Sequence, residues 1–397
     1  MKRIRIPVNN LEKYSFSDSF FSIGSCFSDN AAKYLSSLGV KTFSNPFGAV
    51  YNPHSIYRQL LHITEKGKYT AEDLSFYNGK YFLFCHSALS DSDNQAAVLE
   101  SANKQLLQAK DFFAQSSVFL VTLGTAVIYE TDSAMFKHCN VHEKIITANC
   151  HRVPQNKMTR RVLTHDECCT YINKIIEIIK TAKPGADVIL TISPAKHYPG
   201  EPLLDSVSKA RLKSAAMQVL EDYDNKQIFY FPAYEIFRDE LCDRKWYKND
   251  GTHPNSKAVS FMMKRFTETS FTNATKHTMN EISAIQKLLR HRPTQAAGSA
   301  NYELLKKISS RLKNIKFADT EQLRFETSCR IAENFYNNEK SGSLIEELLP
   351  ENDKKELIFN LTAYFRKECD LQSLPIQLFS DNRLSSMLIS FLTKNGV

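Results

Sequence analysis

The sequence lacks the features that would place the protein in a membrane or in an oxidising compartment. No apolar run among its 397 residues reaches the length of a membrane span, and no apolar signal-peptide core follows the basic residues 1–7. Its nine cysteines are an odd number and form neither a disulfide framework nor a paired Cys-x-x-Cys zinc pattern. We therefore expect a cytoplasmic protein whose thiols are reduced.

A concentrated basic surface is also missing. The formal net charge is +8, but the basic residues are scattered along the chain and form no stripe or known nucleic-acid module. We expect no nucleic-acid partner, whereas an anionic substrate or polymer stays open. The chain is long enough for one large domain and a smaller one.

Apolar, β-rich runs alternate with helical patterns in the first two thirds of the chain. Four such runs end in small or turn-forming residues, and helical patterns cover residues 96–113, 166–180 and 208–220; the runs are residues 20–23, 118–123, 188–192 and 228–231. This alternation predicts an α/β fold with a parallel sheet covered by helices on both faces. In such sheets, ligands bind beyond the carboxyl ends of the strands.

The character of the sequence changes after about residue 270. Apolar residues at helical spacing, with no catalytic pattern, predict a helical C-terminal region; they include Leu304, Leu305, Ile308, Leu312, Ile315, Leu357, Ile358, Leu361 and Phe365. We predict an α/β domain over residues 1–275 and a helical region over residues 276–397. The second region is a candidate for homo-oligomerisation.

The turn Gly24-Ser25-Cys26 offers two candidate nucleophiles directly after the first apolar run. Ser28 or Asp29 is predicted to cap a helix that continues to about Leu38, so that the positive end of the helix dipole would stabilise an anion at the turn. Neighbouring residues leaving a strand point to opposite sides, so only one of Ser25 and Cys26 should face a cleft. The alternative is that both small side chains fill a tight crossing of strand and helix.

Far downstream, Asp250-Gly251-Thr252-His253-Pro254 places a carboxylate three residues before an imidazole. Pro254 suits the first position of a helix. Asp250 could fix the tautomer of His253 and leave Nε2 as a general base. Alternatively, the carboxylate caps the turn and the imidazole only packs.

Other polar residues are candidates for the same cleft. Asn149 and His151 follow a short predicted strand at residues 144–147, and Lys196 and His197 follow the third apolar run. We expect no metal, because His138, Cys139, His142, Cys150 and His151 match no standard zinc spacing. We also expect no cofactor.

Seven segments resemble, in the same order, the motifs of the GSCFA family; they are residues 23–28, 45–53, 122–126, 148–154, 193–197, 230–235 and 250–254. The resemblance covers roughly residues 18–270. This family is similar to the SGNH (GDSL-type) hydrolases, which are flavodoxin-like α/β proteins that hydrolyse or transfer ester-linked acyl groups.

The resemblance assigns roles to single residues. By register Cys26 is the nucleophile, with Ser25 as the alternative, and Asp250 and His253 complete the triad. Gly48 matches a backbone oxyanion donor. The block containing Gly124 and Thr125 lacks the usual Asn after its glycine, so Thr125 and Asn149 are the alternatives for a side-chain donor.

Two functions follow as hypotheses. The first is an acyl-ester hydrolase or acyltransferase that acts on a small-molecule or carbohydrate ester, which the resemblance suggests is acylated carbohydrate or cell-envelope polymer. The second is a non-catalytic binding protein on a degenerate SGNH scaffold, since a fold does not guarantee a chemistry.

Overall fold

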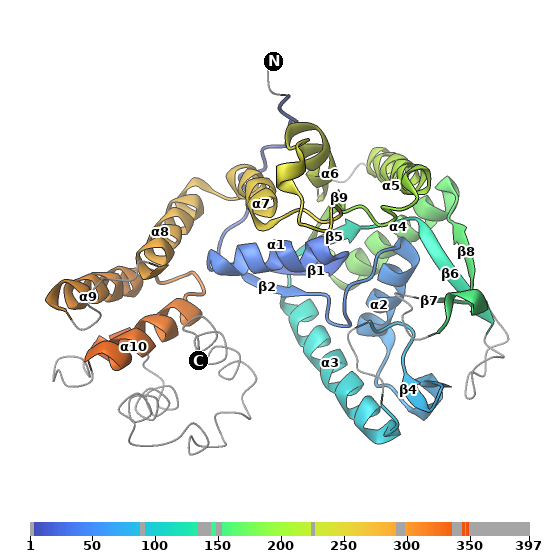
Figure 1. Ribbon diagram of the computed structural model, residues 1–397, viewed down its shortest axis with the longest axis horizontal. Helices are drawn as coiled ribbons and strands as arrows, with labels where there is room; N and C mark the ends of the chain where they lie inside the picture. Colours follow the sequence, from blue (N-terminus) through green and yellow to red (C-terminus); the bar gives the residue numbers. More distant parts are fainter. Residues whose placement is uncertain are drawn as a thin grey trace. The chain divides into compact units, whose positions relative to one another are not determined.

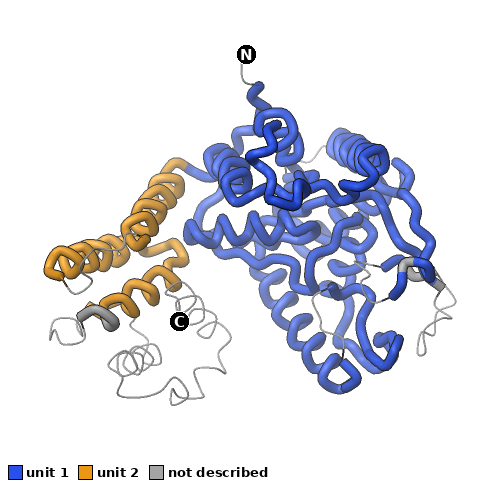
Figure 2. Tube along the Cα trace, viewed as in Figure 1, with its two compact units in different colours: residues 1–272 blue, residues 273–397 orange. Residues whose placement is uncertain are grey.

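The computed structural model describes residues 4–87, 92–132, 144–147, 153–223, 227–290, 298–335, 344–345 and 347–348. The chain divides into two compact units, residues 1–272 and residues 273–397 (Figure 2). Among the described residues, no helix combines the length and the apolar character needed to cross a membrane.

A five-stranded parallel sheet forms the centre of the first unit (Figure 1). Its order is β10-β9-β5-β1-β2, and the strands are β1 (Ser19–Gly24), β2 (Lys41–Ser44), β5 (Val118–Leu123), β9 (Asp187–Ile192) and β10 (Ile228–Tyr230). Counted along the chain, these five strands have the order 2-1-3-4-5, which is the flavodoxin-like arrangement. The predicted α/β fold is confirmed, and each of the four predicted apolar runs is a strand of this sheet.

Helices cover both faces of the sheet. The side chains of Phe21, Val121 and Leu190 pack in one buried cluster with residues of α2 (Pro53–Glu65), α3 (Gln95–Gln115), α4 (His165–Ala182) and α5 (Pro202–Asp222). On the opposite face lie α1 (Cys26–Ser37) and α7 (Ser256–Ser270), where the rings of Phe20 and Phe266 meet at 6.3 Å. Burial on both faces explains why the central strands are almost continuously apolar.

Two small antiparallel sheets flank this core. The hairpin of β3 (Ser75–Tyr77) and β4 (Lys80–Phe82) turns at Asn78 and Gly79, whose φ angles of 50° and 79° are those of a type I′ turn. The second sheet has the order β7-β6-β8, with β6 (Val127–Asp132), β7 (Lys144–Thr147) and β8 (Thr159–Val162). The strand predicted at residues 144–147 is thus confirmed.

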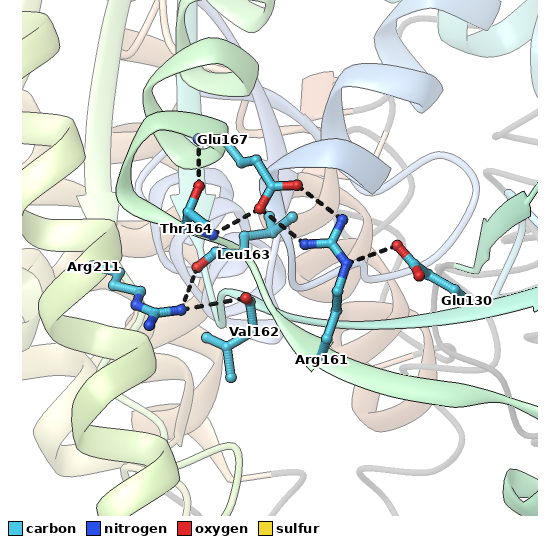
Figure 3. Close-up of polar contacts among 7 residues, drawn as sticks. All are labelled: Glu130, Arg161, Val162, Leu163, Thr164, Glu167 and Arg211. Carbon is cyan, nitrogen blue, oxygen red and sulfur yellow. Dashed lines mark hydrogen bonds and ion pairs between the residues drawn. The ribbon is translucent and has the colours of Figure 1, made fainter.

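Arg161 ties β8 to its neighbours (Figure 3). Its guanidinium donates to Glu130 at 2.8 Å and, through two nitrogens, to both oxygens of Glu167 at 2.8 Å. Glu167 also accepts from the N–H of Thr164 and completes a capping box at the start of α4. From α5, Arg211 donates to the carbonyl of Leu163 at 2.8 Å, so the segment before α4 is held from both sides.

Short helical segments complete the first unit, and longer helices form the second. The short segments are Ala71–Asp73, Gln155–Lys157, α6 (Ala233–Glu235), the π-helical Ile236–Glu240 and Arg244–Trp246. The second unit contains α8 (Asn273–Arg290), α9 (Ser299–Asn314) and α10 (Glu321–Phe335), with Glu281 of α8 bonded to Arg311 of α9 at 2.5 Å. The predicted helical character of this region is confirmed for its described part, and residues 357–365 lie outside it.

Candidate active site

The site expected from the sequence lies where the strand order reverses, between β1 and β5. The register pairs Gly24 with Thr122, and Leu123 of β5 with Ile192 of β9, so the three strands end at the same edge. After β1 the chain enters Ser25 and Cys26, and after β5 it enters Gly124 and Thr125. Such a switch point is where open α/β sheets bind ligands.

Gly24 makes the turn after β1 possible. Its φ is +124°, and a Cβ at this position would lie 2.2 Å from the carbonyl oxygen of Thr122. The Gly24 N–H donates to Oδ1 of Asn45 at 2.9 Å, and the Ser25 N–H donates to the Thr122 carbonyl at 3.0 Å. Because no side chain fits there, the backbone of β1 can approach β5 closely just before the two candidate nucleophiles.

Ser25 is the helix cap. Its side chain is fully buried, its Oγ accepts from the Phe27 N–H at 3.3 Å, and it shares a 3.0 Å hydrogen bond with Oγ1 of Thr122. The expectation that Ser28 or Asp29 caps α1 is therefore wrong. The Ser28 hydroxyl also bonds to Thr122, at 2.7 Å, and the helix begins three or four residues earlier than predicted, at Cys26.

Cys26 is the first residue of α1 and is partly exposed. Burial of the thiol and the charge of Asp29 raise its pKa, while the charges of Lys248 and Lys209 oppose that shift. The backbone N–H of Cys26 contacts its own sulfur and also opposes the shift, and no other acceptor among the described residues takes it. A backbone donor at a helix N-terminus thus lies beside the sulfur and has no other partner among the described residues.

Asp250 and His253 form a hydrogen-bonded pair. Oδ2 of Asp250 lies 2.8 Å from Nδ1 of His253, and Oδ1 accepts the N–H groups of Thr252 and His253 at 2.8 and 3.0 Å. These donors hold the pKa of Asp250 well below its usual range. A fixed carboxylate favours the tautomer with hydrogen on Nδ1, which leaves the Nε2 lone pair free. The side chains of Asp250 and His253 are 46% and 40% exposed.

The start of α7 differs from the prediction. Asn255 caps the helix by accepting from the Ala258 N–H at 3.1 Å, and α7 begins at Ser256. Pro254 therefore lies before the cap and forms an isolated β-bridge with Tyr247. The imidazole is held by a turn that precedes the helix, not by the first turn of the helix itself.

Two backbone contacts anchor this turn beside the sheet edge. The Lys196 N–H, after β9, donates to the carbonyl of Thr252 at 3.1 Å, and the Lys248 N–H donates to that of His253 at 2.8 Å. The charge of Lys248 also acts on Cys26. Within the described residues no hydrogen bond joins the Cys26 thiol to His253, so proton transfer between them needs a water molecule or a small approach.

The glycine and threonine candidates for oxyanion donors are engaged elsewhere. The Gly48 N–H donates to the Asn45 carbonyl at 2.8 Å, and the N–H groups of Gly124 and Thr125 both donate to the carbonyl of Tyr51, at 2.8 and 2.9 Å. The Thr125 hydroxyl bonds to that of Ser208 at 2.8 Å. Asn149, the other alternative for a side-chain donor, and His151, a candidate for the same cleft, lie outside the described residues.

Lys196 borders a surface pocket beside the Asp250 turn. Its Nζ lies 4.8 Å from the centre of the Tyr247 ring. The pocket has a volume of about 400 Å³, and its lining comprises Lys196, Arg244, Tyr247, Lys248, Asn249, Asp250 and Gly251. Three cationic side chains thus surround one small opening next to the candidate base.

Lys209 is a site residue that the sequence analysis missed. Only 3% of it is exposed, and its Nζ donates to the carbonyls of Gly124 at 2.7 Å and Ser193 at 2.8 Å and lies 3.3 Å from Nδ1 of His197. Burial lowers its pKa to about 7. A signal was present: Lys209 stands three residues before Leu212 and seven before Ala216, on the buried side of α5.

No group of three or more His, Cys, Asp or Glu side chains within the described part of the chain could hold a metal ion. The five residues first considered for zinc are all outside that part. The described part of the candidate site contains a thiol, an imidazole–carboxylate pair, a buried lysine and backbone donors.

Comparison with known proteins supports the resemblance to the GSCFA family. No curated protein matches the chain. The model of the GSCFA family matches residues 19–266, which include both the Gly24-Ser25-Cys26 turn and the Asp250–His253 pair. The chain belongs to the GSCFA family.

Proposed function

We propose that this protein is an SGNH-like acyl-ester hydrolase or acyltransferase in which Cys26 is the nucleophile, His253 the general base and Asp250 the residue that orients it. The observation that carries the proposal is the 2.8 Å contact between Asp250 and His253, on a turn tied to the loop after β9. This pair lies at the sheet edge where Cys26 begins a helix. Such a combination is the outline of an acyl-transfer site.

The chemistry begins from a thiol, because burial and Asp29 raise the pKa of Cys26. Nε2 of His253 takes the thiol proton, directly or through one water, as sulfur attacks the carbonyl carbon. The negative oxygen that forms accepts the Cys26 N–H. Collapse expels the alcohol, which receives the proton from His253 and leaves a thioester on Cys26. Water or another hydroxyl then repeats these steps and releases the acyl group.

Burial separates the two candidate nucleophiles. The Ser25 hydroxyl is fully buried and occupied by Thr122 and the Phe27 N–H, whereas Cys26 is partly exposed. A hydroxyl that caps a helix and bonds across the sheet would have to give up both contacts to attack a substrate. We therefore favour Cys26.

The pocket beside the Asp250 turn supports an acyl ester that carries an anionic group. No carboxylate of the described residues forms an ion pair with Lys196, Arg244 or Lys248, so all three can bind a carboxylate or a phosphate. Acylated carbohydrate and cell-envelope polymer, the classes that the family resemblance suggests, include such molecules.

The nucleophile is tested by trapping. The full-length protein would be incubated with short p-nitrophenyl and thioester acyl donors, and the modified side chain would be read by mass spectrometry. We expect the acyl group on Cys26, no adduct with Cys26→Ala, and slow acylation with His253→Ala. Cys242→Ala is the matched control, because Cys242 is an exposed free thiol that does not line the pocket. An adduct that survives Cys26→Ala and persists at full rate in His253→Ala would refute the proposed site.

The anionic subsite has its own test. Lys196→Met and Arg244→Met should raise KM for an acyl ester that carries a carboxylate but leave KM for a neutral ester unchanged. Lys245→Met is the control, because Lys245 pairs with Asp243 at 2.9 Å and does not line the pocket. Equal effects on both esters would exclude the subsite.

The alternative is a non-catalytic binding protein. It is favoured by the absence, among the described residues, of a hydrogen bond between Cys26 and His253, and by the engagement of Gly48 and Thr125 in other contacts. If no acyl donor labels the wild type, while an acylated sugar still binds in a calorimetric titration, this alternative replaces the enzymatic proposal.

A further inference from the structure

One turn of α5 holds His197 at two points. The carboxylate of Asp205 accepts the backbone N–H of His197 at 2.9 Å, and four residues later Nζ of Lys209 lies 3.3 Å from its Nδ1. The loop after β9, which contains His197, is therefore fixed by a pair of oppositely charged side chains on one helix face. A lysine exposed on the surface would not need to be paired with a carboxylate and a histidine in this way.

The hydrogen bonds of Lys209 determine which nitrogen of His197 carries the hydrogen. Below its pKa of about 7, Lys209 is an ammonium group with three hydrogens, and the carbonyls of Gly124 and Ser193 take two of them. The third points at Nδ1, which can accept it only if that nitrogen bears no hydrogen. The Ala195 carbonyl, 3.1 Å from Nδ1, would favour the opposite tautomer, but then an ammonium hydrogen would face an imidazole N–H.

The other ring nitrogen lies over Gly124. A Cβ on Gly124 would be only 2.7 Å from Nε2 of His197, so the glycine leaves room for the imidazole at the end of β5. Tyr51 packs edge-on against the same ring at 5.0 Å. Within the described residues, Nε2 has no hydrogen-bond partner of its own.

His197 also lies among the groups of the candidate site. The Cys26 charge acts on both Tyr51 and Lys209, which are the two side chains in contact with the imidazole. Burial and then the charge of Lys209 lower the pKa of His197, and His253 adds to that shift. The imidazole is therefore neutral, contacts two side chains that feel the Cys26 charge, and itself feels the charge of the candidate base.

We propose that Lys209 is a positioning residue that holds His197 with its hydrogen on Nε2, and that this N–H is the side-chain donor to the oxyanion formed on attack by Cys26. It would supply the donor that the Gly124 block lacks in place of the usual Asn. The oxyanion role rests on the proposed function, whereas the orientation of His197 by Lys209 does not.

The orientation is tested in the wild-type protein without any substrate. With ¹⁵N-labelled histidine at pH 6, long-range ¹H–¹⁵N spectra distinguish the two neutral tautomers of an imidazole. The signals that disappear in the His197→Gln variant are those of His197. We expect hydrogen on Nε2 in the wild type and a shift toward Nδ1 in Lys209→Met. Ser208→Ala is the matched control on the same helix: it removes the hydrogen bonds to the Thr125 hydroxyl and from the Ala126 N–H but should leave the tautomer unchanged. Hydrogen on Nδ1 in the wild type would overturn the proposal.

The oxyanion role is tested with two substitutions at His197. The amide nitrogen of Gln reaches about as far as Nε2, whereas that of Asn reaches only as far as Nδ1. We expect His197→Asn to lower kcat by about 10²–10³ with little change in KM, and His197→Gln to recover part of the loss. Equal activity of the Asn variant and the wild type would overturn the oxyanion role alone. A wild type that transfers no acyl group would refute the proposed function and this role with it, and the tautomer spectrum would still decide the part played by Lys209.

Discussion

Replacing Ser25 and Cys26 one at a time should separate the contribution of this turn to stability from its contribution to acyl transfer. Ser25→Ala removes the cap of α1, which contributes about 1 kcal/mol, and a buried hydrogen bond to Thr122 of about the same size. The expected loss is about 2 kcal/mol. For a unit of this size the melting temperature falls by roughly 2–4 °C per kcal/mol, so we expect a decrease of about 4–8 °C with acyl transfer preserved below the transition.

Cys26→Ala should show the opposite pattern. The side chain is partly exposed and loses a single heavy atom, so the free energy of unfolding should change by less than about 1 kcal/mol. Covalent acylation should disappear. Both variants would be compared by circular-dichroism melting and by mass spectrometry of the acylated protein.

Ser28→Ala is the internal control for the stability term. Its hydroxyl also bonds to Thr122, at 2.7 Å, but it caps nothing, so it should reproduce only the hydrogen-bond part of the loss. The reasoning would be refuted if Ser25→Ala abolished acylation without a lower melting temperature, because the hydroxyl would then serve chemistry and not the fold.

Three further substitutions test the geometry around this turn. Gly124→Ala places a Cβ 2.7 Å from Nε2 of His197, and the displaced imidazole should lower kcat/KM by about 10²-fold in a steady-state assay; unchanged kinetics would contradict the close approach. Asp250→Asn removes the acceptor that fixes His253, so we expect kcat to fall by up to about 10⁴-fold with little change in melting temperature; a loss of less than tenfold would argue against the pair. In the Lys209→Met variant, the free energy of unfolding should lose the part of its pH dependence that comes from this lysine. The pKa of this lysine falls from 10.5 to about 7 on folding, so above pH 7 the unfolded chain binds the extra proton and stability rises with pH up to about 10.5. Urea unfolding at pH 7 and 8.5 should show a gain of about 2 kcal/mol in the wild type that the variant lacks.

The buried strands could be predicted because each is a continuous apolar run. The edge strand β2 (Lys41–Ser44) could not, since it is partly exposed, short and carries no apolar run. Its place in the sheet comes from pairing with β1, a long-range contact that local pattern does not encode.

The chemistry-bearing turns could be predicted from residue type, but the roles within them could not. Ser25 and Ser28 are equally good caps by propensity. Both hydroxyls bond to Thr122 of the neighbouring strand, and what distinguishes Ser25 in the fold is that its Oγ also accepts the Phe27 N–H. Lys209 was missed for the same kind of reason: a lysine in a helix is usually solvated, and only the packing of α5 against the sheet buries this one.

The arrangement of the Gly24-Ser25-Cys26 turn explains why a serine and a cysteine can stand side by side without competing for one role. A cap must direct its oxygen back toward the N–H groups of the first helical turn, and in doing so Ser25 turns its hydroxyl into the protein, against Thr122. The next residue starts the helix, so its side chain projects in a different direction and its own N–H has no partner within the helix. Capping therefore uses the hydroxyl and leaves the sulfur partly exposed beside its own backbone N–H. In a Gly-Ser-Cys turn built this way, the position of the cap itself favours the thiol as the reactive group.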